Sequence, residues 1–384
     1  MNQFKNTVLV FSGLLLLTVF EMSCKKDNNS GPPVVPLPTI TSFTPTSANP
    51  GATITITGTN FTGATAVSFG GTAATSFTVT NATTITAVVG NGATGNVMVT
   101  TAGGSATKAG FTLTLPPIDG YNNSNEVGAA SLKAHWTFDS TATERISTAV
   151  PEKNAGTMAY VTGKIGKAIS LSQAYMIYPA IANLNNADAL PNFSVSMWTK
   201  VPDNTTTLAS LFQINGVNFQ DIWGLVGLMT RTNGNVYALG TTTTHVNGSG
   251  THPAYADFFL DPGKTATEGF TAGADGWAFI TITYDGPTNL LTYYGNGVKL
   301  GTRTLTNVTA PETLALLTPN KVSFGTFEFK DDFNTGAYGN PPAAVDRPWA
   351  SHGITASLDD VRVFNKALSQ TEVSALLHLG QAGR

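Results

Sequence analysis

The sequence predicts an all-β protein with two sandwich-type domains and one short helix near its end. Between residues 39 and 115, short strands carry isoleucine, valine and phenylalanine on one parity and threonine or serine on the other, with glycine and asparagine turns between them. Residues 358–364 alternate in the same way and lead into a capped helix. Charged residues make up only 11% of the chain, against about 25% in globular proteins. Such a composition is typical of exported all-β proteins.

The first 23 residues predict a lipoprotein signal peptide. Their apolar run, residues 8–20, is shorter than the ~20 residues that a membrane-spanning helix needs. Residues 22–24, Met-Ser-Cys, resemble a bacterial lipobox, in which the cysteine is acylated and becomes the first mature residue, although Glu21 stands where an aliphatic residue is usual. An ordinary signal with an incidental cysteine is the alternative. Cys24 is the only cysteine, so no disulfide forms within the chain.

Residues 24–38 predict a flexible tether, because they lack aromatic residues and periodicity and are rich in proline and glycine. Their start, CKKDN, is similar to that of lipoproteins of Bacteroidetes-type bacteria, and Lys25 directly after the cysteine favours export beyond the inner membrane. We therefore expect a membrane partner through the lipid anchor and an outer-membrane location, on either the surface or the periplasmic face. A formal net charge of -3 without a basic cluster argues against a nucleic-acid partner.

Residues 39–115 predict a small antiparallel sandwich of about 77 residues. The motif P-T-I-x-x-F-x-P-x-S-A-x-P-G-A-T-I-T-I-T-G-T-N-F at residues 38–61, followed by residues 67–71, resembles the IPT/TIG immunoglobulin-like domains. The resemblance implies a spacer, or a module through which a protein partner binds. The segment has no histidine and almost no charge, so it offers no catalytic group.

Residues 116–131 predict a linker, and residues 132–384 predict a second, larger domain. Near its end, Ser369 and Glu372 form a capping box at the start of a helix. The segment 358–377 resembles the closing segment of the laminin-G-like branch of the concanavalin A-like jelly rolls. Motifs similar to that family's earlier strands and hairpins follow the expected order at residues 135–139, 163–169, 192–198 and 277–285. The resemblance implies a jelly roll with a short C-terminal helix, and it specifies the fold rather than the ligand.

The second domain lacks the motif of this fold's best-known enzymes. The β-glucanases carry Glu-x-Asp-x-Glu or a close variant on one strand, and retaining hydrolysis needs two carboxylates ~5 to 5.5 Å apart. In the nearest match, residues 328–332, Lys330 replaces the middle acid, and Glu328 and Asp332 would lie ~13 Å apart on a strand. No histidine pair has zinc-site spacing and no G-x-S-x-G elbow is present. We expect no enzyme; a hydrolase with carboxylates from distant strands is the less favoured alternative.

Three aspartates predict a calcium site that joins the two ends of the second domain. If the first and last strands lie side by side, Asp139 comes near Asp359 and Asp360. Carboxylate oxygens suit calcium, which takes 6 to 8 of them at ~2.3 to 2.6 Å. The alternative is that Asp359 and Asp360 cap the strand or pair with Arg362.

The ligand is expected on the rim of the jelly roll. Trp136, Trp198 and Trp277 fall at strand positions that predict core packing, which leaves the sheet faces without a tryptophan platform. Long loops, one within residues 215–274 and one at about 327–353, are expected to form the rim.

Aromatic and hydrogen-bonding side chains in these two segments form the predicted ligand site. The alternative is that the loop aromatics only pin the loops onto the sheet. The predicted ligand-binding residues are Trp349, Tyr338, Asp346, Arg347, Trp223 and Tyr255.

The order of tether, spacer and jelly roll predicts a lipid-anchored envelope protein that binds carbohydrate without catalysis. The alternative is an adhesion or structural protein whose jelly roll binds another protein. An aromatic platform flanked by amides would favour a sugar, and a broad apolar patch would favour a protein.

Overall fold

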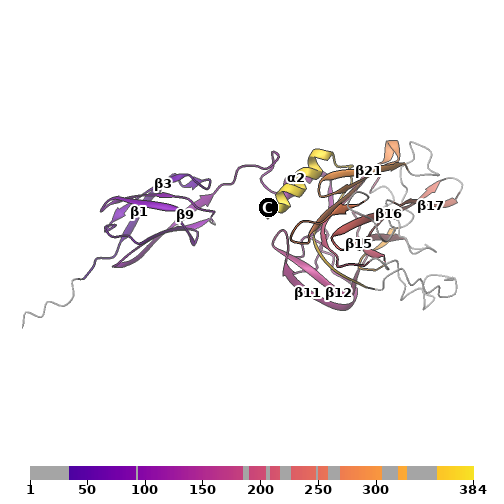
Figure 1. Cartoon of the computed structure of the whole chain (residues 1–384), viewed down its shortest axis with the longest axis horizontal. Helices are drawn as coiled ribbons and strands as arrows, with labels where there is room; N and C mark the ends of the chain where they lie inside the picture. Colours follow the sequence, from indigo (N-terminus) through magenta and orange to yellow (C-terminus); the bar gives the residue numbers. More distant parts are fainter. Residues whose placement is uncertain are drawn as a thin grey trace, which may run out of the picture. The chain divides into compact units, whose positions relative to one another are not determined.

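The computed structural model describes residues 34–91, 94–184, 190–204, 208–216, 226–247, 250–257, 269–304, 319–326 and 353–384, with backbone alone at 216, 240–247, 250–257 and 319–320. The chain divides into two compact units, one that ends at Leu115 and one from Pro116 to Arg384 (Figure 1). In the described part of the chain, no helix has the length and apolar character needed to cross a membrane.

The first unit is a sandwich of two sheets, as predicted. One sheet has the order β1-β3-β7-β6 and the other the order β2-β9-β8-β4-β5. Alternation along β3 places Ile54 and Ile56 in the core, where they meet Phe69 and Phe111 from the facing sheet. The strands are β1 (Thr39–Thr44), β2 (Ser47–Ala48), β3 (Thr53–Thr59), β4 (Ala66–Phe69), β5 (Thr72–Ala73), β6 (Ser76–Asn81), β7 (Thr84–Val88), β8 (Gly95–Thr101) and β9 (Gly104–Leu113).

The second unit is a jelly-roll-like sheet of 14 strands in two facing layers. The strand order is β17-β16-β15-β14-β22-β12-β23-β13-β19-β20-β21, while β10 pairs with β23, β11 with β12 and β18 with β16. The strands are β10 (Leu132–Trp136), β11 (Lys153–Thr162), β12 (Lys167–Tyr178), β13 (Phe193–Lys200), β14 (Ala209–Gly216), β15 (Val226–Asn233), β16 (Val236–Asn247), β17 (Gly250–Asp257), β18 (Phe270–Thr271), β19 (Ala278–Asp285), β20 (Leu290–Gly295), β21 (Val298–Thr304), β22 (Pro319–Phe324) and β23 (Ile354–Phe364). Short 3-10 turns lie at η1 (Ser124–Glu126), η2 (Ala129–Ser131) and η3 (Gly286–Thr288).

The last strand, β23, lies at the middle of this sheet. One of its edges pairs with β13, and its other edge pairs first with β12 and then with β10. Asp360 stands where the partner changes and has a left-handed backbone, φ 49°, a conformation that aspartate tolerates better than most residues. The first and last strands of the unit are therefore neighbours, as predicted.

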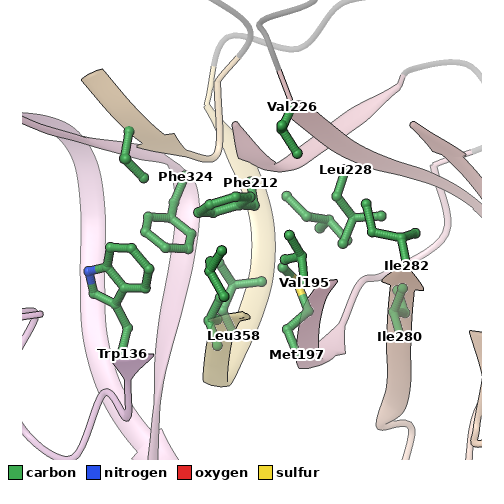
Figure 2. Packing of buried hydrophobic residues seen from close by; sticks show 14 of the residues in the cluster. Trp136, Val195, Met197, Phe212, Val226, Leu228, Ile280, Ile282, Phe324 and Leu358 are labelled. Carbon is green, nitrogen blue, oxygen red and sulfur yellow. The ribbon is translucent and has the colours of Figure 1, made fainter. Parts of the chain in front are cut away.

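Aromatic residues fill the space between the two layers. Trp136 packs edge-on against Phe324 and Phe212, with ring centroids 5.1 and 6.0 Å apart. Figure 2 shows these rings beside Val195 and Leu358. Trp136 is fully buried, which confirms its predicted core position.

The helix α2 (Gln370–Gln381) covers the outer side of one layer. Ser369 caps it, and Glu372 completes the predicted capping box. Its apolar side joins Trp198 and Trp277 in a second buried cluster, which confirms that both tryptophans are structural. A Cβ at Gly380 would come within 2.4 Å of the Trp198 ring, so only glycine permits this close approach.

The expected linker, residues 116–131, lies within the second unit. Val127 is buried in the cluster under α2, and Arg362 of β23 donates to the hydroxyl of Ser124 at 2.7 Å. The stretch 215–274, in which a long loop was expected, contains the strands β15, β16 and β17. Gly234, with φ 57°, lies in the tight turn between the first two of them.

Candidate functional site

Two of the predicted calcium ligands hold one hairpin of the second unit. Asp359 Oδ2 accepts from the backbone N–H groups of Lys164 at 2.7 Å and Ile165 at 3.0 Å. Asp139 Oδ1 accepts from the N–H of Lys167 at 2.7 Å. The two carboxylates therefore hold the turn between β11 and β12 through its backbone N–H groups.

Asp360, the third predicted ligand, lies in a buried ion pair with Arg362. Arg362 Nη2 lies 2.9 Å from Asp360 Oδ1, and His135 Nε2 lies 2.7 Å from the same oxygen. Burial by itself would raise the pKa of Asp360, but the Arg362 charge and the His135 hydrogen bond hold that pKa well below its usual range. Pairing with Arg362 was the alternative to calcium binding for this residue, so Asp139 and Asp359 are the two carboxylates left for a cation.

Asp359 has one carboxylate oxygen to which no described residue donates a hydrogen bond. The residue is fully buried, and Oδ1 has no partner among the described residues. Burial raises the pKa of Asp359 to about 7, and the nearby Asp360 and Asp139 charges act in the same direction. Within the described ranges, no group of three or more His, Cys, Asp or Glu residues could hold a metal. Calcium therefore stays a prediction.

Most of the predicted lipidation and ligand residues fall outside the described part of the chain. These are Cys24, Trp223, Tyr338, Asp346, Arg347 and Trp349. Tyr255 lies on β17, where its backbone pairs with Thr242 of β16.

Among the described residues, β14 carries several buried polar atoms that lack a hydrogen-bond partner. Phe212 and Ile214 of this strand enter the core, so alternation turns Gln213 and Asn215 to the outer face of the sheet. Both amides are fully buried. Among the described residues, neither Nε2 nor Oε1 of Gln213 has a hydrogen-bond partner, and Asn215 Oδ1 has none either. Buried polar groups are almost always paired, because an unpaired one costs about 1 to 3 kcal/mol.

Neighbouring groups extend this neutral polar face across the sheet. Asn215 Nδ2 donates to Ser323 Oγ of β22 at 3.1 Å. Gln213 pairs in register with Ser323 on one side and with Gly227 of β15 on the other. Gly227 is a buried glycine in the interior of β15. We call Gln213, Asn215, Ser323 and Gly227 the amide face.

The register continues through the amide face in a single row of six strands. Ile177 of β12 pairs with Ser323, and Gly227 pairs with Thr242, which pairs with Tyr255. Residues paired in register occupy the same face of a sheet. Tyr255, predicted from the sequence as a ligand residue, therefore occupies the row that contains Gln213.

Aromatic and charged groups border the amide face. Tyr175 lies two residues before Ile177 on β12, outside the core alternation of that strand, and is nearly buried. Lys321 of β22 forms an ion pair with Glu152. The centre of the face is thus neutral, with an aromatic ring and a paired charge at its margin.

A separate cavity of 370 Å³ lies where β13 ends and the chain crosses to the other layer. Its charged lining residues are Lys200 and Asp203. Lys200 Nζ donates to the carbonyl of Asp275 at 3.0 Å, and the Tyr237 hydroxyl lies 2.8 Å from the N–H of Val201. Lys200 and Tyr237 therefore already have protein partners in this cavity.

Gln213, Asn215 and Tyr175 are not among the residues predicted from the sequence as ligand-binding. The segment 209–216 places two amides on one parity and apolar residues on the other, and this signal was readable. The prediction of a rim site rests on the core positions of the strand tryptophans, and it does not include Tyr175, an aromatic residue on β12.

Comparison with known families confirms the assignment of the first unit. The model of the IPT/TIG domain family matches residues 38–115. A comparison with curated proteins found no match.

Solved structures similar to the chain include a neurotoxin and one domain of an arabinanase. One is botulinum neurotoxin type C, whose structure is described as "Cell entry of botulinum neurotoxin type C is dependent upon interaction with two ganglioside molecules"; it is 14% identical, with a TM-score of 0.44 over 66% of this chain and 52% of that chain. Another is domain 4 of AbnA, a GH43 extracellular arabinanase from Geobacillus stearothermophilus, in complex with arabinotriose; it is 21% identical, with a TM-score of 0.39 over 64% of this chain and 98% of that chain. The chain spans about half the length of the neurotoxin structure.

Proposed function

We propose that the protein is a lipid-anchored protein of the cell envelope that binds carbohydrate without catalysis through its second unit, with the IPT/TIG domain as spacer. The amide face is the observation that carries this proposal. Sugars present many hydroxyls, each of which both donates and accepts, and amides offer both functions in one side chain. A few oriented polar groups beside an aromatic ring are the usual composition of a polar ligand site.

The chemistry of the amide face favours binding over hydrolysis. Glycoside hydrolysis requires two carboxylates on either side of the scissile bond. The described groups around Gln213 are an amide, a hydroxyl and a glycine. None of these can act as the acid or the nucleophile of such a reaction.

Affinity electrophoresis against soluble polysaccharides tests the proposal. The chain without residues 1–23 and with Cys24→Ala is run in gels that contain mannan, xyloglucan, arabinan, laminarin, polygalacturonate or alginate. We expect at least one polysaccharide to retard the protein, with no release of reducing sugar on long incubation. Retardation by none would contradict the proposal and favour a protein ligand, and release of reducing ends would show a hydrolase.

A further inference from the structure

The cavity at the end of β13 lies where one layer of the sheet loses a strand. β13 pairs with β23 as far as Lys200, which lies opposite Ser357. β23 continues beyond this point to Ile354 and keeps its pairing with β12 on the other edge. From Ile354 to Ala356, the edge of β23 that faces β13 has no strand partner among the described residues. We call this cavity the notch; its lining residues are 170–171, 200–203, 234–235, 237, 276 and 355–357.

The lining of the notch includes both exposed and core side chains. Lys200, Asp203 and Asn235 are exposed. Leu171 and Tyr237 also line the notch, and both belong to the buried core of the second unit. A ligand can therefore reach the notch from solvent and also contact apolar groups. A few polar groups beside an apolar surface are the usual composition of a site for a small polar molecule.

The size of the notch limits how much of a ligand it can hold. Its volume is 370 Å³, near the lower end of the range of about 300 to 1,000 Å³ for ligand pockets. Five segments surround it, namely β12, β23, the crossing segment that follows β13, the turn between β15 and β16, and the residue before Trp277. A site for the middle of a polysaccharide must be a groove that is open at both ends. A cavity of this size and enclosure suits one sugar ring.

The charged groups of the notch have hydrogen-bonding capacity that the protein does not use. The Lys200 ammonium carries three N–H groups, and one of them donates to the carbonyl of Asp275 at 3.0 Å. Within the described ranges, the carboxylate of Asp203 makes no hydrogen bond or ion pair. Ser170 and Ser357, which pair in register, add two hydroxyls to the lining. The notch thus offers a donor, an acceptor and groups that can act as both.

We infer that the notch binds a single sugar residue at the end or on a branch of a glycan, with Lys200 donating to one ring hydroxyl and Asp203 accepting from another. A hydroxyl both accepts and donates, so two hydroxyls of one ring can meet both charged groups. This inference rests on the proposed function; it adds a site separate from the amide face and specifies the part of the glycan that is bound. A free amino acid also carries an acceptor for Lys200 and a donor for Asp203, so the test must separate it from a sugar.

Three substitutions alter the notch, and a fourth is the matched control. Ser357→Phe places an aromatic ring in the notch, whereas Ser172→Phe places the same ring at an exposed position of β12 outside it. Lys200→Met keeps the aliphatic part of the side chain and removes its donors, and Asp203→Ala removes the acceptor. Binding to the polysaccharide that retards the unsubstituted chain is measured by affinity electrophoresis, and urea unfolding shows whether each variant is folded.

We expect Ser357→Phe to abolish retardation and Ser172→Phe to leave it unchanged. Lys200→Met and Asp203→Ala should each weaken binding by about tenfold, as the loss of a hydrogen bond to a charged group implies. These two substitutions lie at exposed positions, so they also carry the test if Ser357→Phe does not fold.

Calorimetry with sugars of different length tests the size of the bound unit. The ligands are the monosaccharide and the trisaccharide that correspond to the end or branch of the retarding polysaccharide. We expect their dissociation constants to agree within about fivefold, which is less than one further hydrogen bond would add. Free glycine and alanine are expected not to compete with the monosaccharide.

Four outcomes would overturn the inference. Retardation that all three notch variants leave unchanged would move the site elsewhere while the proposed function stands. Tighter binding of the trisaccharide by more than about tenfold would show a groove that follows the chain. Competition by glycine or alanine would make the notch an amino-acid site. Retardation by no polysaccharide would overturn the proposed function together with the inference.

Discussion

Asp359 links the stability of the second unit to pH. The pKa of its buried carboxyl is raised from 3.8 to about 7. Between these values the native state holds a proton that the unfolded chain has lost, so the free energy of unfolding falls as pH rises through this window. In the presence of chelator, we expect urea unfolding to show about 2 to 4 kcal/mol less stability at pH 8 than at pH 4.5 from this group. Asp359→Asn should largely remove this fall, and an equal fall in the variant would contradict the assignment.

Calcium bound near Asp139 and Asp359 would oppose the fall in unfolding free energy at high pH. A ligand that binds only the native state raises its stability. We expect added calcium to raise the melting temperature at pH 8, where Asp359 is ionised, and to do so less at pH 5. Thermal midpoints that neither calcium nor chelator shifts at either pH would remove the calcium prediction.

Arg362 is the residue whose loss should damage the second unit most. It is 1% exposed, pairs with Asp360 and donates to Ser124. Breaking a buried ion pair by removing one partner costs about 3 to 5 kcal/mol, because the other charge stays buried and unpaired. We expect Arg362→Met to lose this amount in urea unfolding. Adding Asp360→Asn to Arg362→Met should restore part of the loss, and additive losses would show that the pair is not coupled.

The N-terminal cap of α2 contributes separately to the stability of the second unit. Ser369 Oγ accepts from the Glu372 N–H, and the Glu372 carboxylate accepts from the Ser369 N–H at 2.9 Å. We expect Ser369→Ala to cost about 1 kcal/mol of unfolding free energy. Ser374→Ala, within the same helix, is the control and should be neutral or slightly stabilising. Equal effects from the two variants would mean that the cap contributes nothing.

Local signals predicted those elements whose residues are close in the sequence. The capping box at Ser369 and the alternation of β3 need only a few neighbouring residues, and both are as predicted. The turn at Gly234 carries an Asn-Gly pair, which is typical of a hairpin, within the stretch where a long loop is predicted from the sequence.

The amide face was not predicted, because its residues meet only through long-range pairing. Gln213 and Ser323 are separated by more than a hundred positions in the chain and become neighbours when β14 pairs with β22. Their unmet hydrogen bonds exist only once the strands are paired. Sequence alternation could show that Gln213 lies opposite Phe212, but not which groups surround it.

For the molecule as a whole, the predicted lipidation of Cys24 would decide where the two units work. An acylated N-terminal cysteine carries more than one acyl chain, which is enough for stable anchoring in a membrane. We expect the unsubstituted protein to sediment with membranes and Cys24→Ala to appear in the soluble fraction, measured by fractionation and immunoblotting. A variant that stays with membranes after cleavage of the signal would contradict the lipoprotein prediction.

The central place of β23 also sets the order in which the second unit can form during synthesis. β10, β12 and β13 all precede it in the chain by many residues, yet each uses β23 as a neighbour. Until residues 354–364 leave the ribosome, these earlier strands lack their shared partner, and the core around Trp136 lacks Leu358. Domains that depend on late long-range pairing fold slowly. The second unit therefore completes its core only when its synthesis is nearly finished.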